Sequence, residues 1–198
     1  MKQEKAMKYE ISKEEVNELH RGGFDGEIVV IEDPEAAARE AKQLLDQETL
    51  LGFDTETRPT FTKGEKGNQP ALLQLARPGK VYLFRLNKTG LLDPLAEILA
   101  NESIIKAGIA IGRDIEELQE LKPFKPAGFV DLNSYAQQKG FESVGVRNLT
   151  AMLLGFRVSK RQQTSNWEAE ELKPAQIRYA ATDAWVCREI YMKLVNHQ

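Results

Sequence analysis

The chain has 198 residues, 41% of them hydrophobic and 29% charged, with a formal net charge of −3 at pH 7. These values are typical of one soluble globular domain and exclude disordered and fibrous classes. No apolar run approaches the roughly 18 residues of a membrane span, and the polar start of the chain carries no secretory signal. The single cysteine, Cys187, excludes an internal disulfide, so we expect a cytoplasmic protein with no membrane partner.

The net negative charge counts against a protein that binds duplexes through a basic face. Clustered carboxylates, however, make a metal-free site negative, and bound cations reverse its local sign. Basic residues also gather in two short segments, 63–66 and 157–161. Net charge therefore does not exclude nucleic acid as a partner.

Apolar runs, helix caps and turn residues divide the chain into elements. Asp33-Pro34 and Asp93-Pro94 each place a capping side chain before a proline at the first helical position, and Gly155 closes a helix. In chain order, the expected elements are a short helix at 13–19, a strand at 28–31, a helix at 34–45, a strand at 50–54, a hairpin of strands at 71–76 and 80–86, a helix at 93–100, a strand at 103–109, a helix at 111–121, a strand at 129–131, and helices at 132–138, 148–154 and 174–194.

The order of these elements predicts the fold class. Strands joined by the tight turn Arg77-Pro78-Gly79 are antiparallel, whereas strands that alternate with helices favour parallel pairing. A mixed sheet flanked by helices follows. Because no repeat or linker divides the chain, we expect a single α/β domain at residues 28–198, preceded by a polar lead-in at residues 1–27.

Asp54 and Glu56 close an apolar strand. Residues i and i+2 of a strand point to the same face, so the two carboxylates project together and repel each other unless a cation lies between them. This pattern favours a metal site. Taken alone, it is also typical of a solvated strand end.

Tyr179 and Asp183 are four residues apart in a helix and therefore share one face. Asp183 lies among small and apolar residues, where a charge needs a partner or a metal. The Tyr179 hydroxyl is then placed to orient an attacking water. The alternative is that Tyr179 belongs to the core and that Asp183 pairs with Arg178.

Asp114 follows a buried strand and lies early in a helix, near the positive helix end. An acid in the first turn of a helix needs no catalytic explanation. Asp114 becomes a candidate metal ligand only because the other acidic residues accompany it. Three acidic blocks together supply four carboxylates, which suffice for a cage around two divalent cations. His20 and His197 lie near the chain ends, and we expect them to be solvated.

The acidic blocks resemble those of the DEDD exonucleases, in the tyrosine-containing branch that includes ribonuclease D and the Werner-syndrome exonuclease domain. Arginine at position 178 excludes the histidine-type variant. The resemblance covers residues 28–195 and is strongest at the last acidic block. Its further motifs are Ala71-Leu72-Leu73-Gln74-Leu75, Asn148-Leu149-Thr150, Ser165-Asn166-Trp167, Leu172, Gln176 and Tyr179-Ala180-Ala181-Thr182-Asp183-Ala184.

The resemblance implies a ribonuclease H-like fold and a metal-dependent 3′–5′ exonuclease that releases nucleoside 5′-monophosphates. It implies that Asp54, Glu56 and Asp183 bind one cation. Asp54 would also reach a second cation, held by Asp114 through water. Oxygen ligands and phosphate suit two Mg²⁺ or Mn²⁺ ions rather than zinc.

Nucleic acid 3′ ends, of DNA or RNA, are the expected partner, and no protein partner is indicated. Charge alone makes Lys63, Arg157, Lys160 and Arg161 candidate contacts, with a solvated surface as the alternative. Trp167 has the chemistry to stack a base, although a tryptophan beside a helix start is more often part of the core.

Two other functions stay open. Ribonuclease D-like trimming of RNA 3′ ends is the first. We expect no helical C-terminal domain and no helicase after residue 198, an expectation that favours a free-standing exonuclease acting on DNA. The second is a nucleic-acid-binding module without catalysis. Such a module is expected to have lost an acidic ligand, and here all four are present.

Overall fold

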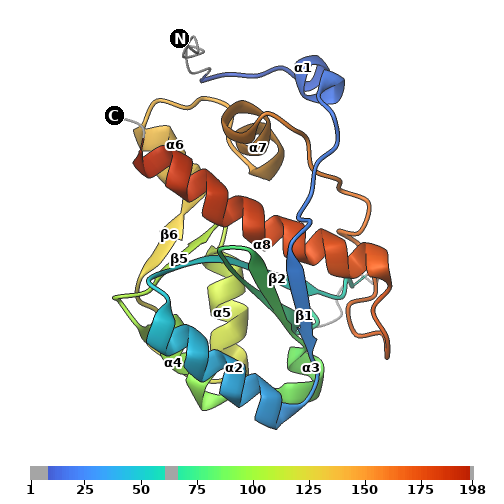
Figure 1. The fold of residues 1–198 in the computed structure, drawn as a ribbon, viewed down its shortest axis with the longest axis vertical. Coiled ribbons are helices and arrows are strands. Elements are labelled where there is room, and N and C mark those ends of the chain that lie inside the picture. Colours follow the sequence, from blue (N-terminus) through green and yellow to red (C-terminus); the bar gives the residue numbers. More distant parts are fainter. Residues whose placement is uncertain (1–8, 61–66, 197–198) are drawn as a thin grey trace.

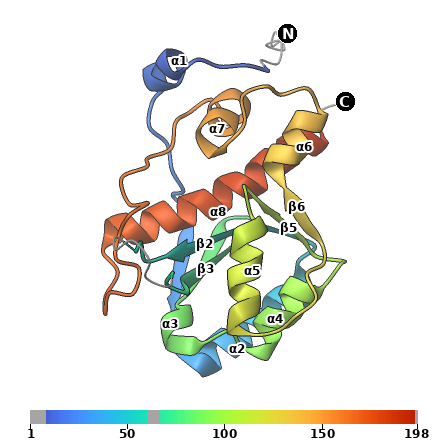
Figure 2. The ribbon, with the colours of Figure 1, turned by 180° about the vertical axis from the view of Figure 1, so that it is seen from behind.

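The computed structural model describes residues 9–60 and 67–196, and over these residues it contains one sheet of six strands flanked by helices (Figures 1 and 2). The strand order is β1-β4-β3-β2-β5-β6. The predicted single α/β domain with a mixed sheet is confirmed. The strands are β1 (Glu27–Ile31), β2 (Leu50–Thr57), β3 (Pro70–Arg77), β4 (Lys80–Phe84), β5 (Ile105–Gly108) and β6 (Phe129–Asp131).

Chain connectivity explains the mixed pairing. The consecutive strands β2, β3 and β4 pair antiparallel, and the predicted turn between β3 and β4 is formed by Pro78 and Gly79, with Gly79 at φ +71°. The remaining pairs are parallel: β1 pairs with β4, β5 pairs with β2, and β6 pairs with β5. The two carboxylates of β2 thus lie in the middle of the sheet.

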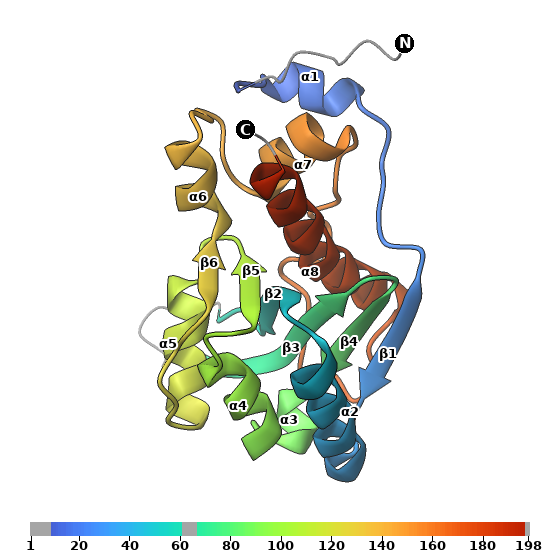
Figure 3. The ribbon, with the colours of Figure 1, turned by 60° about the vertical axis from the view of Figure 1, so that its left-hand side comes forward.

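Helices cover both faces of the sheet. Helix α8 runs diagonally across one face, and α2, α4 and α5 cover the other (Figures 1 and 3). Leu51 and Phe53 of β2 point to the α2–α4–α5 side. Because side chains alternate along a strand, Gly52, Asp54 and Glu56 point toward α8. The helices are α1 (Lys13–Glu18), α2 (Pro34–Gln47), α3 (Leu86–Thr89), α4 (Asp93–Ala100), α5 (Gly112–Leu121), α6 (Leu132–Gln138), α7 (Val146–Leu154) and α8 (Pro174–Val195).

Local signals set most helix ends. Asp33 accepts a hydrogen bond from the Ala36 amide at 2.8 Å, and Gly155 ends α7 in the left-handed conformation, both as predicted. The predicted cap at Asp93 is wrong. Leu92 is the N-cap of α4, and the Asp93 carboxylate instead forms an ion pair with Lys122 of the segment after α5. The single turn α3 was not expected.

The lead-in packs onto the domain over its described part, residues 9–27. Helix α1 contacts α7, and the Val16 and Phe24 side chains are buried. We call residues 20–25 the N-terminal strap. The strap crosses α8 before the chain enters β1 (Figure 1), and the Phe24 amide contacts Thr182 of that helix. None of the helices within residues 9–60 and 67–196 combines the length and apolar character needed to cross a bilayer.

Candidate metal and nucleic-acid site

Asp54 and Glu56 face α8 because a glycine allows the helix to approach. Gly52 lies two residues before Asp54 and therefore on the same face of β2. A Cβ atom at position 52 would lie 1.9 Å from the Ala184 carbonyl oxygen, so any larger residue would push α8 away. The close approach brings the carboxylate of α8 to those of β2.

Tyr179, Asp183 and Cys187 follow one another at intervals of four residues on α8, and all three line a cavity between this helix and β2. The flanking residues Ala181 and Ala184 are small and fully buried, which permits tight packing on the sheet. The carboxylate cavity between β2 and α8 has a volume of about 210 Å³. Its lining residues are Asp54, Thr55, Glu56, Ile109, Val146, Gln163, Tyr179, Asp183 and Cys187.

Asp54, Glu56 and Asp183 form a metal-sized group. Each offers a carboxylate oxygen, and these three oxygens lie within 4.8 Å of one another. Ligands that each lie about 2.0–2.6 Å from a shared Mg²⁺ or Ca²⁺ ion have separations in this range. Glu56 and Asp183 are buried and Asp54 is half-buried, so the carboxylates are shielded from bulk water. The donor set fits a hard divalent cation.

Asp114 approaches the same region from the other side of the sheet. It lies in the first turn of α5, and its Oδ1 accepts a hydrogen bond from the Thr55 hydroxyl. Thr55 is adjacent to Asp54 but points to the opposite face of β2. Asp114 does not belong to the three-carboxylate group, although its charge acts on Asp54 and Glu56. It is therefore linked to the cavity through Thr55 but is not one of the cavity's lining residues.

Burial and mutual repulsion disfavour the ionised carboxylates. Burial and then the charge of Asp54 raise the pKa of Glu56 to about 10. Burial also raises the pKa of Asp183 to about 7, against a hydrogen bond with Tyr179 that lowers it. The pKa of Asp54 is raised by burial and then by Asp183 and Asp114, and the pKa of Asp114 is raised by burial. A bound cation would offset this repulsion.

Tyr179 keeps its proton at neutral pH, because burial and the charge of Asp183 raise the pKa of its hydroxyl. The phenol is therefore a hydrogen-bond donor next to the carboxylates. Its ring lies 6.1 Å from the ring of Trp167, which is fully buried. Trp167 is thus a core residue that packs against Tyr179, and its ring is not exposed for base stacking.

The predicted nucleic-acid contacts fall into two groups. Lys63 lies outside the described residues. Arg157, Lys160 and Arg161 line a hollow of about 340 Å³ on the surface between the strap and α7. Arg161 also lines a larger hollow of about 580 Å³ that shares Tyr179 and Asp183 with the carboxylate cavity. The basic segment 157–161 therefore adjoins the carboxylates. His20 is exposed, as expected, and lines the same larger hollow.

Sequence reasoning missed several residues of these hollows. Cys187 could have been found, because it follows Asp183 by four residues on the same helix face. Thr55 could not, because strand alternation directs it away from Asp54. Arg21 was also missed, since it reaches the site only after the strap folds against α8, and Arg178 was considered only as a partner of Asp183 and not as a lining residue of the larger hollow.

Comparisons with known proteins agree with this geometry. A family model described as 3′-5′ exonuclease matches residues 28–197. Exonuclease 3′-5′ domain-containing protein 2 of Drosophila melanogaster is 36% identical over 149 residues, which are 73% of this chain and 25% of the relative. Ribonuclease D of Gluconacetobacter diazotrophicus is 34% identical over 156 residues, which are 77% of this chain and 38% of the relative. The chain thus spans well under half the length of these relatives.

Solved structures share the fold. The EXO domain of Nibbler from Aedes aegypti is 26% identical with a TM-score of 0.75, covering 84% of this chain and 86% of that chain. Ribonuclease D from Escherichia coli is also 26% identical with a TM-score of 0.75, covering 85% of this chain and 44% of that chain. The predicted ribonuclease H-like architecture is confirmed.

The family match covers most of the chain and includes every residue of the carboxylate cavity. The expected enzyme class is confirmed at the level of the family. On this evidence the chain belongs to the 3′-5′ exonuclease domain family, as its acidic blocks predicted.

Proposed function

We propose that this chain is a divalent-metal-dependent 3′–5′ exonuclease that removes nucleotides one at a time from the 3′ end of a nucleic acid strand. The observation that carries the proposal is the group of Asp54, Glu56 and Asp183, whose carboxylate oxygens lie within 4.8 Å of one another. Their cavity adjoins the larger hollow that Arg161 lines. The reaction is hydrolysis of the last phosphodiester. Its products are a nucleoside 5′-monophosphate and a strand with a new 3′ hydroxyl.

Each acidic residue has a proposed role as a metal ligand. Asp54, Glu56 and Asp183 would hold one cation, and Asp54 and Asp114 would hold a second. The all-oxygen donor set favours Mg²⁺ or Mn²⁺. When bound, such cations lower the pKa of water and neutralise charge on the attacking and leaving oxygens. Thr55 would orient Asp114 through the hydrogen bond described above.

Tyr179 would position the nucleophile. Its protonated hydroxyl donates at the mouth of the cavity, next to Asp183. A water held by this hydroxyl would attack phosphorus as the bond from phosphorus to the 3′ oxygen breaks. The water's oxygen and one hydrogen end on phosphorus, and its other proton ends on the 3′ oxygen. Packing of Tyr179 against Trp167 limits the freedom of the ring and so contributes to orientation.

The preferred polymer needs its own experiment. The sequence favoured DNA, and that preference stays a prediction. Ribonuclease D among the relatives, at 34% identity, supports RNA 3′-end trimming as the second candidate. Phosphodiester hydrolysis by the carboxylate cavity is common to both candidates. The cytoplasmic location also stays a prediction.

The test is a nuclease assay with Mn²⁺ or Mg²⁺ on three 5′-labelled substrates: single-stranded DNA, a duplex with a recessed 3′ end, and single-stranded RNA. We expect stepwise shortening and release of 5′-monophosphates with at least one substrate. Asp54→Ala, purified in the same way, should release none. Metal-independent binding without mononucleotide release by the wild-type protein would contradict the proposal and favour a binding module.

A further inference from the structure

The N-terminal strap builds one wall of the larger hollow beside the carboxylate cavity. This basic hollow, of about 580 Å³, is lined by Arg21 and Asp25 of the strap, by Arg161, and by Arg178 of α8. Tyr179 and Asp183 belong to both the basic hollow and the carboxylate cavity. Any strand that reaches the carboxylates by this route passes the strap.

Specific backbone contacts hold the strap in place. The Gly22 amide donates to the Arg157 carbonyl at 3.1 Å, and the Arg157 amide donates to the His20 carbonyl at 3.0 Å. Further along, the Phe24 amide donates to Thr182 Oγ1 at 3.0 Å, and the Phe24 side chain is buried. The strap is thus paired on both sides of Arg21.

Glycine at position 22 permits this packing. A Cβ atom there would lie 2.3 Å from Phe156 Cδ2, and Phe156 is itself stacked on Trp185 with ring centroids 5.9 Å apart. A larger side chain at position 22 would therefore displace either the strap or the aromatic pair. The absence of a side chain at Gly22 thus allows the strap to pack closely against Phe156 of the domain.

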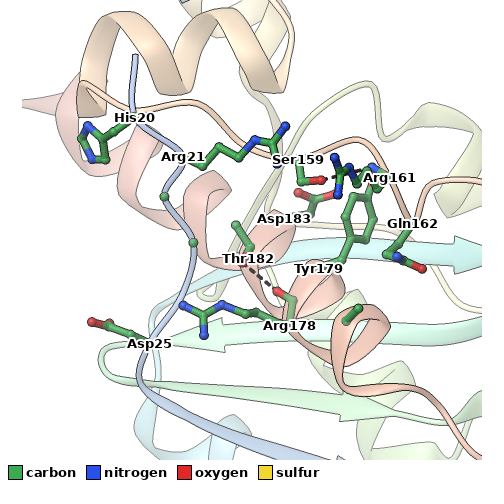
Figure 4. A pocket seen from close by; sticks show the side chains of 13 residues that line it. His20, Arg21, Asp25, Ser159, Arg161, Gln162, Arg178, Tyr179, Thr182 and Asp183 are labelled. Atoms are coloured by element: carbon green, nitrogen blue, oxygen red, sulfur yellow. Dashed lines mark hydrogen bonds between the residues drawn. The ribbon is translucent and has the colours of Figure 1, made fainter. Parts of the chain in front are cut away.

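Arg21 and Arg161 converge on the entrance of the carboxylate cavity from two different segments. Figure 4 shows Arg21 extending from the strap toward Ser159 and Asp183, with Arg161 on the opposite side near Tyr179. Arg178 points toward the strap, on the side of Asp25. Arg21 and Arg161 are exposed, and neither forms an ion pair with any residue that the structure describes.

Unpaired guanidinium groups beside a phosphodiester-cleaving site suit the phosphates of the substrate. Arginine offers a planar pair of donors that matches a phosphate group. A 3′-terminal nucleotide has no phosphate beyond the scissile one, so every further phosphate of the strand lies on the 5′ side. The positive charge continues past the basic hollow, because Arg21 and Arg161 also line the neighbouring hollow with Arg147, Arg157 and Lys160.

We infer that Arg21 of the N-terminal strap, with Arg161 facing it, binds the strand phosphates on the 5′ side of the scissile bond. The inference rests on the proposed exonuclease function and names a residue that lies before the family match, which begins at residue 28. Arg21 is a positioning residue that holds the strand. It does not act on the reacting atoms.

The test compares Arg21→Ala with two kinds of substrate. One is the p-nitrophenyl ester of thymidine 5′-monophosphate, which has a single phosphodiester, and the other is a series of single-stranded DNA and RNA oligonucleotides of increasing length. We expect kcat/KM to fall about tenfold on oligonucleotides, as for loss of one charge-assisted contact, and to stay unchanged on the ester. Arg21→Lys should keep most of the activity, and Arg21→Glu should lose more than Arg21→Ala.

Arg39→Ala is the matched control, because Arg39 is an exposed arginine of α2, away from both hollows. It should match the wild type on both substrates. The dependence of log affinity on log salt concentration gives a second readout, since each lost phosphate contact lowers the slope for a single strand by about 0.7. Arg21→Ala should show this reduction and Arg39→Ala should not.

Two results would overturn the inference: equal activity of Arg21→Ala and Arg39→Ala on long oligonucleotides, or the same loss for Arg21→Ala on the ester. If the wild type cleaves neither substrate, the proposed function fails. In that case, the affinity for oligonucleotides, measured by fluorescence anisotropy in Ca²⁺, still tests whether Arg21 of the strap contacts the strand. Weaker binding by Arg21→Ala supports the strap contact, and unchanged binding overturns it.

Discussion

The carboxylate cavity and the basic hollow adjoin each other and share Tyr179 and Asp183, yet the chain builds them in different ways. The cavity comes from residues two apart on a strand and four apart on a helix. The hollow joins Arg21 to Arg161, from segments far apart in the sequence. Local spacing therefore encodes the chemistry, whereas tertiary packing of the strap creates the surface that we propose holds the strand.

The largest expected effect is loss of the cavity's cations. Asp54→Ala and Asp183→Ala should each lower exonuclease activity by a factor of about a thousand or more, because bound cations contribute several kcal/mol to the transition state. Product release from labelled strands measures the loss, and thermal unfolding checks that the fold is retained. Glu97→Ala, an exposed acid on α4, is the control. Metal-dependent cleavage by purified Asp54→Ala at a rate close to that of the wild type would disprove the site assignment.

Removal of the Tyr179 hydroxyl should have the next largest effect. Tyr179→Phe is expected to slow turnover about a hundredfold, as for a lost proton-handling or water-orienting group, with Mn²⁺ affinity kept. Tyr191→Phe in the same helix α8 is the matched control. If Tyr179→Phe weakens Mn²⁺ binding as much as Asp183→Ala does, the water-orienting role is wrong.

Thr55→Val tests how Asp114 is held. Loss of the hydroxyl that donates to Asp114 should reduce activity about tenfold, the lower end of effects seen for groups that orient metal ligands. Thr57→Val, in the same strand, removes a longer contact of 3.4 Å to Glu117 and should change little. Equal activity of the two variants would show that Asp114 needs no support from Thr55.

The stability of the metal-free protein should depend on the protonation of Asp183. The pKa of Asp183 is about 7 in the folded protein and near 3.8 when unperturbed, so the folded state binds a proton that the unfolded chain releases above pH 4. The free energy of unfolding of the metal-free protein should therefore fall from about pH 4 through 7, by up to about 1.4 kcal/mol per pH unit for each such proton.

Thermal unfolding with EDTA or Mn²⁺ at pH 5 and pH 8 measures this effect. Mn²⁺ should raise the melting temperature more at pH 8 than at pH 5, and Asp183→Asn, which removes one of the repelling carboxylates and a proposed ligand, should reduce the difference. An equal Mn²⁺ effect at the two pH values would contradict the account of repelling carboxylates.

The contrast between local spacing and tertiary packing also explains which parts of the site could be predicted from the sequence. The two elements that bear the three clustered carboxylates follow local rules, a period of two in β2 and a period of four in α8. Spacing singled out their residues as candidates, and the resemblance to the exonuclease family supplied their roles. Helix ends elsewhere follow local caps such as Asp33 and Gly155. Asp93 shows the limit of a local rule, because a distant partner, Lys122, takes the carboxylate expected to cap α4.

Long-range contacts account for what was missed. The hydrogen bond from Thr55 to Asp114 joins residues 59 positions apart, and that from Phe24 to Thr182 joins residues 158 positions apart. No periodicity marks such pairs. The strap reads as a polar lead-in because its few apolar residues carry no pattern, although Phe24 is buried against α8.

Counting bound Mn²⁺ by electron paramagnetic resonance, with a nucleoside 5′-monophosphate present, tests the central claim most directly. The claim is that Asp54, Glu56 and Asp183, together with Asp114, hold two catalytic cations. The account predicts two Mn²⁺ per wild-type chain and loss of both in Asp54→Ala, which would ligate each of them. An unchanged count in Asp54→Ala, or no bound Mn²⁺ in an active wild-type protein, would contradict it.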